Sequence, residues 1–132
     1  MIGLDTNVLL RYLVQDDPAQ SRRATEIIER RLTEQNPGFV SIVSIVEIVW
    51  VLGSLYGRTR WQIAQHIEMI LAADTLEVQN EQEVYQAVVA LRSGAGTFED
   101  ALIGSIGIWR GCSATLTFDR SAAKRLNGFQ LI

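Results

Sequence analysis

Short apolar segments alternate with helical segments along this 132-residue chain, and this alternation limits its possible folds more than any other feature. Strands are expected at 1–5, 39–42, 75–79, 114–118 and 129–132. Helices are expected at 7–15, 19–35, 44–56, 60–73, 81–93, 98–110 and 121–126. Strands joined by helices of this length favour crossover connections and a parallel sheet covered on both faces. We therefore expect a three-layer α/β/α fold with a mostly parallel central sheet.

Capping and turn residues indicate where the helices begin and end. Asp16 or Asp17 before Pro18 fits an N-cap followed by proline in the first turn. Gly57 is expected to end the helix over 44–56, and Thr59 is expected to cap the next helix. No repeat, linker or low-complexity tract interrupts the pattern, so we predict a single domain over residues 1–132.

Composition narrows the functional classes. A net charge of -3 argues against a protein that coats DNA through a basic surface, although a few arginines can still hold phosphates beside a metal ion. The apolar stretch over 42–55 contains Ser44, Glu47 and Ser54 and is too polar to span a membrane. No secretory signal is visible, and the single cysteine, Cys112, is expected to be a buried structural thiol. These features predict a cytoplasmic protein without membrane association.

Four carboxylates stand in apolar surroundings or directly after predicted strands: Asp5, Glu47, Asp100 and Asp119. Burying an unpaired carboxylate is costly, and Lys124 is the only lysine in the chain. Asp5 and Asp119 would each follow a strand, whereas Glu47 and Asp100 would lie near helix starts, so all four could meet at the carboxyl edge of a parallel sheet. Two carboxylates about 4 Å apart repel by roughly 4 kcal/mol at an effective dielectric near 20, so such a cluster requires a cation.

Oxygen ligands without histidine or cysteine companions select hard cations such as Mg²⁺ or Mn²⁺. A cation of this kind activates water and stabilises the charge that develops on phosphorus during phosphodiester cleavage. Asn7 and Thr117 each lie two residues from a strand-ending aspartate and are expected to orient it. Asp100, Gly104, Gly107 and Gly111 share one helix face, and the glycines suggest that a neighbouring backbone or a ligand comes close to it.

Taken in order, the acidic motifs resemble those of PIN-domain ribonucleases. The resemblance rests on Leu-Asp-Thr-Asn-Val-Leu-Leu around Asp5, Ser-x-x-Glu ending at Glu47, Asp-Ala-Leu-Ile-Gly from Asp100 and Thr-Phe-Asp ending at Asp119. Their order and spacing match across essentially the whole chain. The small size is most similar to the VapC toxins of bacterial type II toxin-antitoxin pairs.

The resemblance implies a PIN-like fold and a Mg²⁺- or Mn²⁺-dependent endoribonuclease that cuts structured RNA, such as tRNA or ribosomal RNA. Asp5 and Asp100 would be the principal metal ligands, and Asp119 and Glu47 would complete the catalytic site. The two polar residues named above would support these carboxylates. The resemblance also implies a homodimer and a small antitoxin whose C-terminal segment covers the site.

Three of the four carboxylates also fit ordinary structural roles. Asp5 and Asp119 could each cap a following helix, and Asp100 could favour a helix start through the dipole. Glu47 has no such role, because no basic residue lies one turn away on its helix.

Two further functions compete with a nuclease. A phosphotransferase of the haloacid-dehalogenase type would place a second acid where this chain has Asn7, which argues against that class. A non-catalytic module that binds RNA or a partner on the same fold is the other possibility, and the intact acidic set disfavours it.

Several other residues are candidates for contacts with partners. Because they lie in or beside predicted loops, we expect phosphate contacts from Arg58, Arg60, Arg120, Lys124 and Arg125. As anchors of the core or of an interface we expect Trp50, Trp61 and Trp109. We expect some side chains of a further group, made of a tyrosine and four apolar residues, to line a dimer or antitoxin interface: Leu9, Tyr12, Leu13, Val49 and Leu52.

Overall fold

The computed structural model describes residues 1–132 as an α/β protein. Its first half contains β1 (Ile2–Gly3), α1 (Thr6–Val14), α2 (Pro18–Glu26), the π-helix η1 (Ile27–Arg31), β2 (Gly38–Val40), α3 (Ile42–Ser54) and α4 (Arg60–Ala72). Its second half contains β3 (Leu76–Val78), α5 (Glu81–Ser93), α6 (Phe98–Trp109), β4 (Thr115–Thr117), α7 (Arg120–Arg125) and β5 (Phe129–Leu131). Every strand and helix that the sequence predicts is present.

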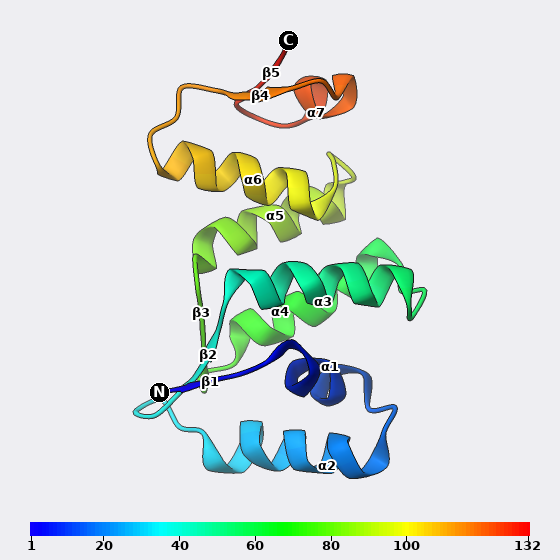
Figure 1. Ribbon diagram of the computed structural model, residues 1–132, viewed down its shortest axis with the longest axis vertical. Coiled ribbons are helices and arrows are strands. Elements are labelled where there is room, and N and C mark those ends of the chain that lie inside the picture. The colour runs from blue at the N-terminus through cyan, green and yellow to red at the C-terminus, as the bar shows by residue number, and fades with distance from the viewer.

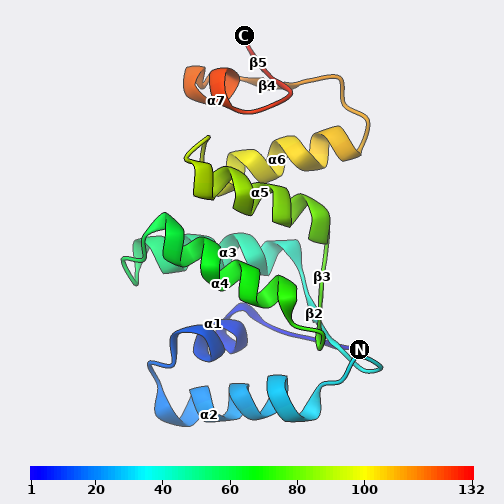
Figure 2. The same cartoon turned by 180° about the vertical axis from the view of Figure 1, so that it is seen from behind.

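All strand pairs are parallel, and the strands form two separate sheets. The first sheet has the order β1-β2-β3, with Ile2 opposite Gly38 and Gly38 opposite Leu76. The second sheet consists of β4 and β5, with Thr115 opposite Phe129. Figures 1 and 2 show this second sheet beyond α5 and α6, on the side away from α1 and α2. The mostly parallel α/β class is confirmed, and within one chain its five strands are divided between two sheets.

The core is formed mainly by apolar faces of the helices. Residues that are almost fully buried include Leu9 of α1, Ile45 of α3, Ile67 of α4 and Phe98 of α6. The strands add only two residues to this cluster, Val40 and Val78. No residue of β4 or β5 belongs to it, so a separate contact holds the second sheet to the rest of the chain.

The second sheet packs against the glycine-lined face of α6. A Cβ atom at Gly104 would lie 2.5 Å from the Phe129 ring, and one at Gly107 would lie 3.2 Å from Thr115 Oγ1. The expectation of a close neighbour is therefore confirmed for Gly104 and Gly107, and the neighbour is a strand pair. It is wrong for Gly111, which lies beyond the end of α6 and has no atom within 4 Å of its Cβ position. Asp100 lies one turn before Gly104 on the same helix face.

Most helix boundaries follow the predicted caps. Asp17 caps α2 by accepting a hydrogen bond from the Gln20 amide at 3.0 Å, and Thr59 forms a capping box at the start of α4. The helix predicted over 19–35 is too long, because it ends in η1. The Leu32 amide donates to the Ile27 carbonyl at 3.0 Å, and Leu32 itself is buried in an extended conformation that directs the chain toward β2.

Two predictions about apolar side chains are wrong, and the prediction for the tryptophans is narrowed to an interface. Most of the apolar residues assigned to a partner surface are instead buried in the core: Leu9, Leu13, Val49 and Leu52. The tryptophans are not core anchors, since more than half of each is exposed: Trp50, Trp61 and Trp109. Cys112 is exposed because it lies in the loop between α6 and β4, outside the helix face that packs. None of the helices has the length and apolar content needed to cross a membrane.

Candidate active site

The turn between β1 and α1 carries Asp5 and lies beside α3. Thr6 Oγ1 donates a hydrogen bond to Glu47 Oε2 at 3.0 Å, and the Thr6 side chain is buried. Asp5 occupies the N-cap position of α1, but its carboxylate accepts no hydrogen bond from the helix. Helix capping therefore does not account for Asp5. Thr6 belongs to the Leu-Asp-Thr-Asn motif, but nothing in the sequence alone singles it out as a partner of Glu47.

Glu47 lies on the rim of an apolar groove between α3 and α6. The groove has a volume of about 570 Å³ and is lined by Ile42, Val43, Val46, Glu47, Trp50, Glu99, Leu102, Ile103 and Ile106. Glu47 and Glu99 are the only charged residues in this lining. Glu47 is exposed, so it is not the buried core charge that its apolar neighbours in the sequence suggested.

Asp100 lies in the first turn of α6 and is half-buried. Thr97 caps this helix, because its Oγ1 accepts a hydrogen bond from the Asp100 amide at 3.1 Å. The Asp100 carboxylate has no hydrogen-bond partner of its own. It is therefore stabilised only by its place near the positive end of the helix dipole, and its oxygens are free to bind a ligand.

Asp119 caps a helix, as its position after a strand and before α7 allows. Its Oδ1 accepts hydrogen bonds from the amides of Ser121 at 2.8 Å and Ala122 at 3.2 Å. Thr117 Oγ1 accepts from the Asp119 amide at 2.9 Å, which holds the turn after β4. Capping occupies only one of the two carboxylate oxygens. Asn7 is exposed on α1 and makes no side-chain hydrogen bond.

The four carboxylates do not meet within one chain. No group of three acidic, histidine or cysteine side chains lies close enough together to hold a metal ion. The reason is topological, since Asp5 follows β1 in one sheet and Asp119 follows β4 in the other. Thr6 brings the Asp5 turn to Glu47, whereas Asp100 and Asp119 belong to the elements around the second sheet. The residue types suit a hard cation, but their placement in a single chain does not.

Two of the predicted phosphate-binding residues converge on the turn that leads into α6. A Cβ atom at Gly94 would lie 3.0 Å from Arg60 Nη1, and Arg125 Nη1 donates to the Gly94 carbonyl at 3.5 Å. The guanidinium of Arg60 also lies 5.6 Å from the centroid of the exposed Trp61 ring. Neither arginine takes part in the two ion pairs of the chain, which are Arg11 with Asp16 and Arg92 with Glu68.

The other predicted phosphate contacts differ in exposure. Arg120 and Lys124 are exposed on α7. Arg58 is only half-buried, but its Nε is enclosed without a hydrogen-bond partner, as is Nδ1 of His66 on α4. Burial, with a smaller contribution from the positive charge of Arg58, lowers the pKa of His66.

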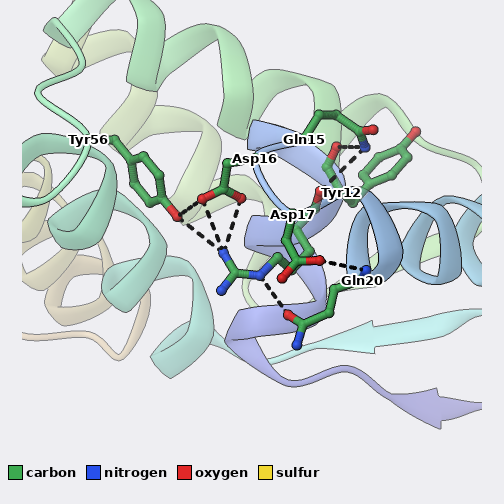
Figure 3. Close-up of polar contacts among 7 residues, drawn as sticks. Tyr12, Gln15, Asp16, Asp17, Gln20 and Tyr56 are labelled. Atoms are coloured by element: carbon green, nitrogen blue, oxygen red, sulfur yellow. Dashed lines mark hydrogen bonds and ion pairs between the residues drawn. The ribbon is translucent and has the colours of Figure 1, made fainter.

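A polar network links Arg11 of α1 to Asp16, to Gln20 of α2 and to Tyr56, which follows α3. Figure 3 shows Asp16, Gln20 and Tyr56 of this network. Arg11 Nη1 lies 3.1 Å from Asp16 Oδ1, and its Nε donates to Gln20 Oε1 at 2.7 Å. The Tyr56 hydroxyl donates to Asp16 Oδ2 at 2.7 Å. This hydrogen bond, together with Arg11, lowers the pKa of the Asp16 carboxyl. The network is a structural tie, so Arg11 is not available for phosphate contact.

The comparison with protein families explains the order of the acidic motifs. The PIN domain profile matches residues 2–127, which is nearly the whole chain. No curated protein matches the chain at a significant level. PIN domains are generally nucleases that use divalent metal ions, and many are toxins of toxin-antitoxin systems. The chain belongs to the PIN domain family.

Proposed function

We propose that this chain is a metal-dependent endoribonuclease of the VapC toxin type. The observation that carries the proposal is the PIN domain match over residues 2–127, within which the four acidic motifs occur in order. Asp5, Glu47, Asp100 and Asp119 are the proposed catalytic and metal-binding set. Two observations support parts of this set. The Thr6 hydroxyl donates a hydrogen bond to Glu47, and the Asp5 carboxylate accepts no hydrogen bond from the helix that it precedes.

The proposed metal is Mg²⁺ or Mn²⁺. The carboxylate set contains no nitrogen or sulfur ligand, and oxygen ligands favour hard cations. The structure limits this proposal, because one chain does not bring three of the carboxylates together. A complete site therefore requires either a change in how the two sheets of one chain lie relative to each other or carboxylates from a second copy.

The proposed substrate is a structured RNA such as tRNA or ribosomal RNA. Arg60 and Arg125 are the best placed candidates for backbone contact, since both lie against Gly94, on the turn that leads to Asp100. Both are free of ion pairs. Cations of this kind position RNA through its phosphates without reading its sequence. The exposed Trp61 beside Arg60 offers a surface on which an unpaired base can stack.

The proposed partners are a second copy of the chain and a small antitoxin. The groove between α3 and α6 fits a segment with apolar and basic side chains, because its apolar lining is interrupted only by Glu47 and Glu99. A segment bound there would lie directly beside Glu47 and would restrict access to it. The cytoplasm is the proposed compartment, on the basis of the single cysteine.

Purified protein incubated with RNA tests the function. We expect cleavage that stops when a chelator removes divalent ions and resumes when Mg²⁺ or Mn²⁺ is added back. Release of inorganic phosphate from small phosphate esters, with RNA left intact, would instead favour the phosphotransferase. Tight RNA binding without cleavage under every metal condition would favour the non-catalytic module.

A further inference from the structure

Four strand edges of this protein lack a partner, on β1 and β3 of the first sheet and on β4 and β5 of the second, and β1 and β4 are the two strands that lead to Asp5 and Asp119. β1 pairs only with β2, and β4 pairs only with β5. The side chains on these strands include exposed apolar groups: Ile2 is 51% exposed and Leu116 is 60% exposed. Phe118, directly after β4, is 83% exposed. Unpaired edges with apolar side chains are templates for pairing with another strand.

The exposed surface of the chain is larger than a closed monomer requires. The chain exposes 7961 Å². A compact protein of 14.7 kDa exposes about 6,900 Å². The excess of about 1,000 Å² is comparable to the roughly 800 Å² that each partner buries in a standard-size protein interface. The chain therefore has enough surplus surface for one stable partner.

Pairing β1 with β4 of the same chain would require the second sheet, together with the α6 helix on which it packs, to move relative to the first sheet. Phe129 lies against Gly104, and Thr115 lies against Gly107, which fixes β4 and β5 on α6. Figures 1 and 2 show α5 and α6 between this sheet and the rest of the chain. A strand from a second copy can reach either edge without such a rearrangement.

We propose that two copies of this chain pair β1 of each with β4 of the other, so that each acidic site is shared between the copies. The inference rests on the proposed nuclease function and names the partner that completes its site. Each copy offers a β1 edge and a β4 edge, so a two-fold dimer pairs both of these edges in each copy and closes. Each composite sheet has the order β3-β2-β1 continued by β4 and β5 of the partner copy.

Parallel pairing, which every strand pair of this protein uses, brings the separated carboxylates to one edge. Asp5 and Asp119 each follow their strands by two residues. Neighbouring strands lie about 4.8 Å apart, so the two carboxylates would be adjacent across the junction. Thr6 keeps Glu47 with Asp5, and Asp100 lies on the α6 face that carries β4 and β5.

Cross-linking tests the pairing independently of activity. In a Cys112→Ser background, one chain carries Gly3→Cys and a second chain of different mass carries Leu116→Cys. Gly3 has open space around it, so the new side chain fits. We expect a short bis-maleimide to join the two chains after mixing, and light scattering to give twice the 14.7 kDa chain mass. If a chain with both cysteines links only to itself, or if no cross-link forms, the proposal is overturned.

Complementation tests the shared site. A chain with Asp5→Asn is mixed with a chain with Asp119→Asn. Asparagine is also a good N-cap residue, so the second replacement preserves the start of α7. A shared site leaves one intact site in each mixed dimer, so random exchange restores about a quarter of the parent activity. If the parent cuts RNA and the mixture does not, the shared site is wrong while the nuclease function stands. A parent that never cuts RNA contradicts the nuclease function and leaves the cross-linking result valid.

Discussion

The hydroxyl of Thr6 donates to the carboxylate of Glu47 at 3.0 Å and ties the turn that carries Asp5 to α3. Residues 41 positions apart are thereby held at one place, on the side of the molecule where the first motif begins. Thr6 is 4% exposed, so its hydroxyl is shielded from water, whereas the Glu47 carboxylate is exposed. We therefore propose Thr6 as a positioning residue for the proposed acidic site.

Thr6→Val removes the hydroxyl and keeps the shape of the side chain. We expect RNA cleavage to fall by about 10- to 100-fold, as for other residues that orient metal ligands. Thr6→Ser retains the donor and should recover most of the activity. Measuring the metal concentration for half-maximal cleavage separates positioning from folding, because only a positioning role shifts it. Equal rates for Thr6→Val and the parent would remove Thr6 from the site.

Gly104→Ala tests how the second sheet is held. The new Cβ would lie 2.5 Å from the Phe129 ring, so β5 must move or the helix must shift. We expect the free energy of unfolding to fall by about 1–3 kcal/mol. Gly53→Ala is the matched control, because its Cβ would lie 3.5 Å from Ile63 and gains helix propensity of up to about 1 kcal/mol. Urea unfolding of both variants should show changes of opposite sign.

Arg60→Ala and Arg125→Ala test the proposed phosphate contacts at Gly94. Each replacement should weaken binding to RNA of any sequence and lower the slope of log affinity against log salt by about 1. Arg30→Ala is the control, since Arg30 is exposed on η1, an element that carries none of the acidic motifs. Salt titrations by fluorescence anisotropy give these slopes. An unchanged slope for both variants would place the RNA on another surface.

His66 makes the stability depend on pH. Burial and Arg58 lower the pKa of His66 below its ordinary value of 6.5, so the unfolded chain binds this proton more readily. The free energy of unfolding therefore carries no penalty from His66 above pH 6.5. It decreases as the pH falls from 6.5 toward the pKa of His66 in the folded chain. His66→Gln should flatten this part of the unfolding curve. The carboxyls with lowered pKa values, Asp16 and Glu68, act at lower pH and should leave this window unchanged.

The sequence predicts local structure well, because local signals decide it. Asp17 with Pro18 and Thr59 with Gln62 set helix starts through contacts between residues close together in the chain. The alternation of strands and helices likewise indicates parallel pairing. The four acidic motifs indicate the PIN family, and the family profile confirms this assignment.

The arrangement of the sheets could not be predicted in the same way. Whether β4 lies beside β1 of its own chain depends on how β5 packs against Gly104, a long-range contact that strand propensity does not encode. The role of Thr6 depends equally on a partner far along the chain. The sequence also leaves open whether the tryptophans belong to the core or to an interface, and the structure excludes the core because more than half of each is exposed.

The most direct test of the acidic site is RNA cleavage by Asp5→Asn and Asp100→Asn, compared with Asp74→Asn. Asp74 is an exposed aspartate between α4 and β3, so its replacement controls for the loss of one surface charge. We predict that Asp5→Asn and Asp100→Asn abolish metal-dependent cleavage while circular dichroism and unfolding midpoint stay unchanged, and that Asp74→Asn cuts at the parent rate. Cleavage at the parent rate by both Asp5→Asn and Asp100→Asn would contradict the assignment of the acidic site.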